Sequence, residues 1–130
     1  MKEEELDWYC FPDEERAMKF LMEALYIGEI LTKALAILSI NQSGLLKYVF
    51  NSEKQERKKA IEITSSLFQT LEEKGKANYQ DPFLQVVVKR GEKGIVVGIK
   101  AEGGRVELKF DGLAREYKGK VMEEGYKSVV

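Results

Sequence analysis

Apolar residues recur at helical spacing through the first half of the chain. From about 13 to 40 the pattern has the 3.6-residue period of an α-helix, with polar side chains on only about a third of its circumference. Pro12 and the acidic residues that follow it favour a helix start there. A second helical pattern runs from about 53 to 74, between a capping box that starts at Ser52 and a helix-ending Gly75. Two antiparallel helices are therefore predicted.

After residue 82 the period of the apolar residues changes from 3.6 to 2, as in a half-buried strand. Strands are predicted at about 83–90, 95–102 and 105–110, with hairpin turns at Glu92-Lys93 and Gly103-Gly104. This register puts Val88 opposite Val97, Val86 opposite Ile99, and Ile99 opposite Leu108, so that every apolar set lies on one face. The second half is therefore predicted to form a three-stranded antiparallel meander.

The remaining segments carry weaker patterns. Residues 41–44 resemble a turn, and 75–81 resemble a polar linker. In the tail, Leu113, Tyr117 and Val121 recur at helical spacing. Glycines in the same stretch weaken the prediction of a helix, so a short added strand is the alternative. At 130 residues the chain is long enough for one core, so we predict a single α+β domain. Its helical part would extend to about 78, and the meander with its tail would follow from about 79.

The first helix is unusually apolar for a chain of this size. Its ~28 residues would span ~42 Å, whereas a compact domain of this length has a radius of gyration of only ~14 Å. Either Gly28 interrupts the helix or a second subunit covers it. An aromatic cluster precedes the helix and could also anchor a partner, although such a cluster more often packs onto its own helix. The interface residues predicted on these grounds are Trp8, Tyr9, Phe11, Phe20, Leu21, Leu31 and Leu35.

Composition excludes several kinds of active site. The chain has no histidine and only one cysteine, Cys10, which rules out Ser-His-Asp and Cys-His catalysis and a structural zinc site. We therefore expect no cofactor and no catalytic residue. Glu23 and Glu29 lie within the apolar helix and would be acid/base candidates if they were buried, but the spacing of Glu29 to Lys33 favours a solvated stripe.

Two local groups of basic residues suggest a nucleic-acid-binding subunit as the alternative function, although the net charge is only −1. One group opens the second helix, where ion pairs at i, i+4 also fit an ordinary solvated face. The other lies on the outward face of the meander, where basic and apolar residues alternate. The predicted contacts are Lys54, Arg57, Lys58, Lys89, Lys100, Arg105 and Lys109.

The apolar stretch 17–40 is interrupted by charges that oppose insertion into a bilayer, and the acidic N-terminus does not resemble a signal peptide. A cytoplasmic protein without membrane contact is therefore expected. Lys and Glu dominate the charged residues, as in heat-adapted proteins. The favoured function is that of a non-enzymatic assembly component, bound to a second copy of itself or to another protein subunit.

Overall fold

The computed structural model describes residues 3–38, 42–101 and 107–122, with the backbone alone for 4, 31–38, 42–53 and 107–109. The fold is α+β, as predicted, but it has more strands than expected. In chain order the elements are a short 3₁₀ helix (Glu3–Glu5), β1 (Asp7–Phe11), α1 (Glu14–Leu38), α2 (Gln42–Lys74), β2 (Lys76–Gln80), β3 (Leu84–Gly91), β4 (Gly94–Ala101), α3 (Glu107–Glu116) and β5 (Lys120–Met122).

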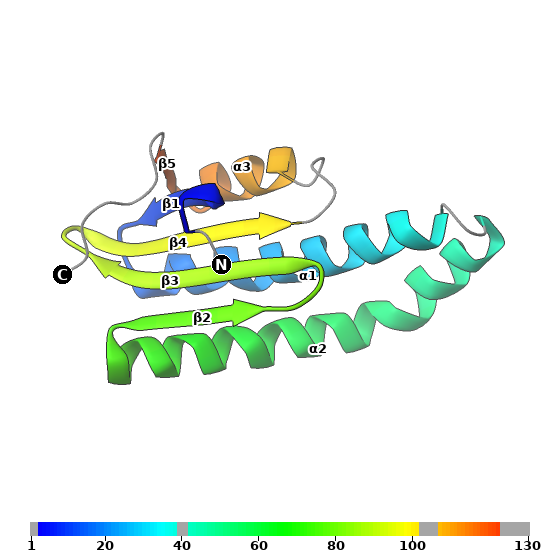
Figure 1. Cartoon of the computed structure of the whole chain (residues 1–130), viewed down its shortest axis with the longest axis horizontal. Helices are drawn as coiled ribbons and strands as arrows, with labels where there is room; N and C mark the ends of the chain where they lie inside the picture. Colours follow the sequence, from blue (N-terminus) through cyan, green and yellow to red (C-terminus); the bar gives the residue numbers. More distant parts are fainter. Residues whose placement is uncertain (1–2, 39–41, 102–106, 123–130) are drawn as a thin grey trace.

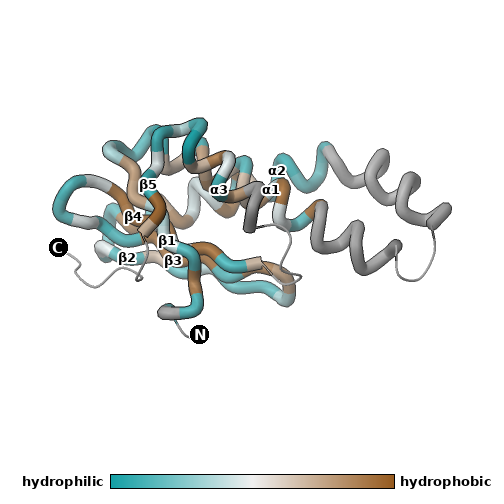
Figure 2. Tube along the Cα trace, turned by 90° about the horizontal axis from the view of Figure 1, so that it is seen from above, coloured by the Kyte–Doolittle hydropathy of each residue, from teal (hydrophilic) through white to brown (hydrophobic). Residues whose placement is uncertain are grey.

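The five strands form one antiparallel sheet in the order β2-β3-β4-β1-β5. All three helices lie on the same face of this sheet, and α1 and α2 run along it as an antiparallel hairpin (Figures 1 and 2). The 3₁₀ helix lies on the opposite, outer face, where Leu6 packs with Trp8. Helices on one side and an almost open sheet on the other make a two-layer architecture.

The β3–β4 hairpin has the register that the alternation predicts. Val88 pairs with Val97, Val86 with Ile99, and the strands meet at Gly91 and Gly94. The third predicted strand, 105–110, is wrong, because the described part of that segment belongs to α3. The neighbour of β4 is instead β1, which pairs Tyr9 with Val97. The predicted turn at Gly103-Gly104 lies outside the described residues.

The structure differs from the sequence-based expectations at three further places. The second helix begins at Gln42 rather than at 53, so Ser52 lies within it and does not cap it. The packing of α2 against α1 overrides the local capping signal. The supposed linker 75–81 contains β2, in which Ala77 and Tyr79 face the helices. Gly28 does not break α1; it lies against the side chain of Leu84 at the start of β3.

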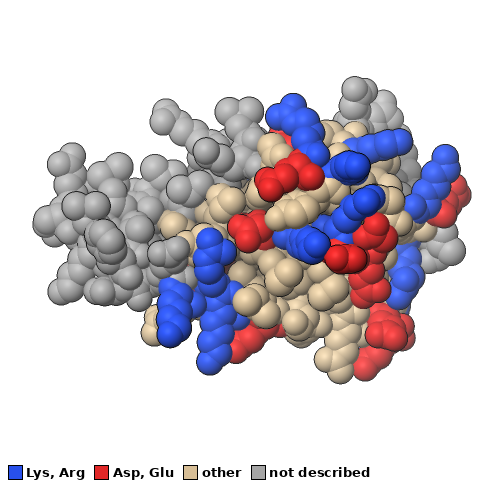
Figure 3. Space-filling model, turned by 180° about the vertical axis from the view of Figure 1, so that it is seen from behind, with Lys and Arg blue, Asp and Glu red and all other residues tan. Residues whose placement is uncertain are grey.

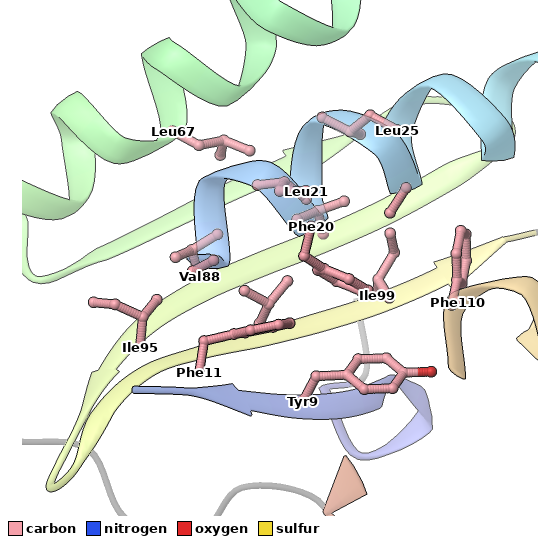
Figure 4. Close-up of a cluster of buried hydrophobic side chains, with 14 of the residues drawn as sticks. Tyr9, Phe11, Phe20, Leu21, Leu25, Leu67, Val88, Ile95, Ile99 and Phe110 are labelled. Carbon is pink, nitrogen blue, oxygen red and sulfur yellow. The ribbon is translucent and has the colours of Figure 1, made fainter. Parts of the chain in front are cut away.

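The core lies between the helices and the inner face of the sheet (Figure 4). At its centre the Phe20 ring of α1 contacts two aromatic rings of β1, with centroids 5.1 Å from Tyr9 and 4.9 Å from Phe11. From α3, Phe110 and Ala114 are fully buried in the same cluster. The Tyr9 hydroxyl donates a hydrogen bond of 2.6 Å to Asp111, which joins β1 to α3.

The α1–α2 hairpin is longer than the sheet it covers. Gly28 of α1 lies against the first residue of β3, so the rest of the helix continues past the end of the strands. The remaining residues of α1 and the first turns of α2 extend beyond the sheet side by side (Figure 1). At 1.5 Å per residue, the nine residues 30–38 span about 13 Å. We call residues 30–38 and 42–55 the hairpin tip.

Candidate functional site

The aromatic and apolar residues predicted as an interface belong mostly to the protein's own core. Five of them are at most 2% exposed: Trp8, Tyr9, Phe11, Phe20 and Leu21. In β1, Tyr9 and Phe11 belong to the core on the helix side, whereas Trp8 packs with Leu6 on the outer face. The other two, Leu31 and Leu35, are in the part of α1 beyond Gly28, where the structure describes only the backbone.

On the outer face of the sheet, acidic residues of the N-terminal segment contact the predicted basic residues. The carboxylate of Glu3 lies 2.9 Å from Lys76 and 3.0 Å from Lys89. The hydrogen bond that Lys76 donates is the largest influence on the pKa of Glu3 and lowers it. Partial desolvation raises this pKa, but the hydrogen bond from Lys89 lowers it further, so the net shift is downward. Lys89 is only 7% exposed, and its ammonium group lies 5.2 Å from the centre of the Trp8 ring. This lysine is therefore engaged within the chain.

The other predicted nucleic-acid contacts, as far as the structure describes them, do not assemble into one basic surface. Lys100 lies 3.5 Å from Glu5, and Arg57 lies 3.5 Å from Glu23 and 4.0 Å above the Tyr26 ring. Lys54 and Lys58 are exposed on α2, where basic and acidic side chains are interspersed over the helical face (Figure 3). Arg105 lies outside the described residues, and the side chain of Lys109 in α3 is not described.

The prediction that Glu29 lies on a solvated stripe is wrong. Glu29 is 3% exposed, because the segment between β2 and β3 covers this side of α1 near Asp81. Desolvation raises the pKa of Asp81, but hydrogen bonds involving Glu29, Tyr79 and the backbone of Phe83 and Leu84 outweigh it and lower the pKa to about 2. Desolvation and Asp81 together raise the pKa of Tyr79. This polar cluster fastens the β2–β3 connection to α1.

Glu23, the other acid/base candidate, lies apart from this cluster. Its side chain is 37% exposed and contacts Arg57 of α2. Of the two candidates, Glu29 is therefore buried and Glu23 is not.

A groove of about 520 Å³ crosses the outer face at the end where β3 turns into β4. Its floor is a row of three side chains from neighbouring strands, because Cys10 of β1 pairs with Val96 of β4 and with Lys120 of β5. Met122 and Pro12 add apolar surface. Its charged lining comprises Glu92, Lys93, Lys118 and Lys120. Sequence reasoning did not find this groove, because its residues come from three segments that lie far apart in the sequence, 10–12, 91–96 and 118–122.

The polar end of this groove includes a strained residue. Lys118 has a φ of +60°, in the left-handed region that ordinarily favours glycine. It ends α3 in a Schellman arrangement, in which the amide of Gly119 bonds to the carbonyl of Ala114 and that of Lys118 to Arg115. By contrast, α2 ends on a glycine, Gly75, with a φ of +77°. A lysine therefore occupies a position that a glycine would fill at lower cost.

Within the described part of the chain, no three side chains of the metal-ligating types Cys, Asp and Glu gather in a way that could hold a metal ion. Neither α1 nor α2, over the residues described, has the apolar length that a bilayer crossing needs. The sequence matches no model of a known protein family, and neither a curated protein nor a solved structure is significantly similar to it.

Proposed function

We propose that this chain is a non-enzymatic assembly component that associates with a second copy of itself through the hairpin tip. The observation that supports the proposal is the length of α1 and α2 relative to the sheet. Up to Gly28, α1 packs on β3, β4 and α3, and its buried face belongs to the common core. Beyond that residue α2 is its neighbour, and no strand of the described sheet continues alongside (Figure 1).

The sequence of the tip is too apolar for a pair of helices to bury. Residues 34–38 are five consecutive apolar residues, Ala-Leu-Ala-Ile-Leu. Successive helical residues are about 100° apart, so five in a row occupy positions around the whole circumference of the helical backbone of α1. The helix α2 can cover one side of it only. On α2 itself, Leu45, Leu46, Val49 and Phe50 recur at helical spacing.

A second hairpin of the same sequence is the partner that fits this surface. Two helical hairpins packed side by side form a four-helix bundle, in which each helix buries one apolar face. A two-fold arrangement of this kind is the commonest one among homo-oligomers. The net charge of −1 gives little repulsion between copies. Burial of apolar surface would drive the association, at about 25 cal/mol per Å² removed from water.

Variants at the tip test this proposal. In Leu35→Glu a charge would enter the proposed interface, and the mass by size-exclusion chromatography with light scattering should fall to that of one chain. Leu31→Lys is a second variant with the opposite charge and the same expected result. Ser65→Glu is the matched control, because Ser65 is exposed on α2 beside the sheet. It should leave the mass unchanged.

Circular dichroism must show that each tip variant retains the helical content and melting transition of the unmodified chain. If both folded variants associate as strongly as the unmodified chain does, the tip is not the interface. If the unmodified chain is a monomer at all concentrations, the proposed function is wrong.

A further inference from the structure

We propose that the groove on the outer face, between the β3–β4 turn and the end of α3, binds an organic anion with an apolar body. The site is separate from the hairpin tip, which lies at the opposite end of the strands (Figure 1). Its volume of about 520 Å³ is within the ~300–1,000 Å³ of ordinary small-molecule sites.

The lining has two chemically different parts. Val96, Cys10, Met122 and Pro12 provide an apolar floor. Three lysines, Lys93, Lys118 and Lys120, provide positive charge, against the single acidic residue Glu92. A molecule with a hydrocarbon or aromatic body and a carboxylate or phosphate end would complement both parts, because its anion would neutralise lysines that otherwise repel one another.

These lysines differ from those elsewhere on the outer face. Lys76, Lys89 and Lys100 are each within 3.5 Å of a carboxylate of the N-terminal segment. Among the described residues, the three lysines of the groove have no carboxylate within ion-pairing distance. Within the part of the chain that the structure describes, their positive charge is therefore available to a ligand.

The backbone at Lys118 provides an independent argument. A non-glycine residue in the left-handed conformation costs about 1 kcal/mol or more relative to glycine. Helices commonly end on glycine at this position, and α2 does so at Gly75. The cost of a lysine at the end of α3 is explained if its ammonium group contacts a ligand in the groove.

The experiment uses decanoate below its micellar concentration as the probe. Binding is followed by calorimetry and by the fluorescence of Trp8, the only tryptophan, which packs in the same outer-face cluster as Cys10 and Met122. Decanoate should bind, whereas inorganic phosphate, an anion without an apolar body, should bind at least about tenfold more weakly. Decyltrimethylammonium, which has the apolar body with the opposite charge, should not bind.

The Lys118→Gly variant separates binding from folding. It removes the ammonium group and relieves the backbone strain, so its melting temperature should be equal or higher while its affinity for decanoate falls about tenfold. Lys74→Gln, at the exposed end of α2, is the control and should bind as the unmodified chain does. Lack of decanoate binding, unchanged affinity in Lys118→Gly, or equal binding of the cationic amphiphile would each overturn the proposal.

Discussion

The ring of Trp8 occupies the space that a side chain at Gly98 would need. The two residues are partners across β1 and β4, and a Cβ built at Gly98 would lie 2.8 Å from Cζ3 of Trp8. Such a distance is shorter than real Cβ contacts, so Trp8 must move if Gly98 is replaced. The absence of a side chain at one residue therefore determines where the tryptophan lies on the outer face.

The Gly98→Ala substitution should destabilise the protein by about 1–3 kcal/mol, the usual cost of overpacking. Because Trp8 would be displaced toward solvent, its fluorescence emission should shift to longer wavelength in the folded state. Gly112→Ala is the matched control. Gly112 lies in α3 with no atom within 4 Å of its Cβ position, so alanine should stabilise the helix by about 0.5–1 kcal/mol. Urea denaturation of both variants measures the change in the free energy of unfolding. Equal changes in Gly98→Ala and Gly112→Ala would contradict the packing of Trp8 against Gly98.

The two helix ends give a pair of opposite predictions. Gly75→Ala places a side chain at a φ of +77° and should lower the free energy of unfolding by about 1 kcal/mol. Lys118→Gly removes a side chain from a φ of +60° and should raise it by a similar amount. Chemical denaturation checks both. The assignment of these C-caps is wrong if the two substitutions change stability in the same direction.

The Asp81 carboxylate should make stability depend on pH in the acid range. Its pKa is lowered from 3.8 to about 2 in the folded protein, so the unfolded chain takes up the proton first as the pH falls. The stabilisation is present above about pH 4 and is lost between about pH 4 and pH 2. In Asp81→Asn this contribution is removed. The difference in the free energy of unfolding between the unmodified protein and Asp81→Asn should therefore become smaller as the pH falls through that range.

Denaturant titrations of the unmodified protein and of Asp81→Asn at several pH values measure this difference in the free energy of unfolding. Asparagine keeps an oxygen that can accept the amide hydrogen bonds of Phe83 and Leu84, both 2.7 Å in the unmodified protein. Its amino group cannot accept the 2.6 Å hydrogen bond that the Tyr79 hydroxyl donates to the other carboxylate oxygen, so only the pH dependence of the comparison reports the charge. A difference that stays constant from neutral pH to pH 2 would show that Asp81 has an ordinary pKa.

The β3–β4 hairpin was predictable because all its information is local. Alternating apolar residues and a turn flanked by Gly91 and Gly94 specify one register, and that register is the one observed. The helix α1 was predictable for the same reason, since its period is clear over many turns. Gly75 was recognised as a helix end from its position, and its left-handed φ agrees.

The position of β1 could not be inferred from the alternation, because its partner β4 is more than eighty residues away. Residues 105–110 alternate as a strand would, so they resembled the missing neighbour of β4. Two signals pointed to the observed arrangement. The run from Trp8 to Phe11 is continuously apolar, which is typical of a strand buried on both faces. Phe110, Ala114 and Tyr117 recur at helical spacing.

The candidate sites differ in how far the sequence could indicate them. The apolar pattern of the first helix was visible in the sequence, and the structure adds that residues 30–38 of this helix lie beyond the sheet (Figure 1). The groove was not visible, because Cys10, Val96 and Lys120 become neighbours only through the order of the strands. The buried position of Glu29 likewise depends on the β2–β3 connection, which the pattern had assigned to a linker.

Sedimentation equilibrium of the unmodified chain, at low micromolar to several hundred micromolar concentration, tests the central claim most directly. Self-association through the hairpin tip predicts that the mass rises with concentration toward twice 14.9 kDa. Because the proposed contact is apolar, the association should persist in high salt, which screens interactions between exposed charges. A mass of 14.9 kDa at every concentration and salt condition would contradict the account.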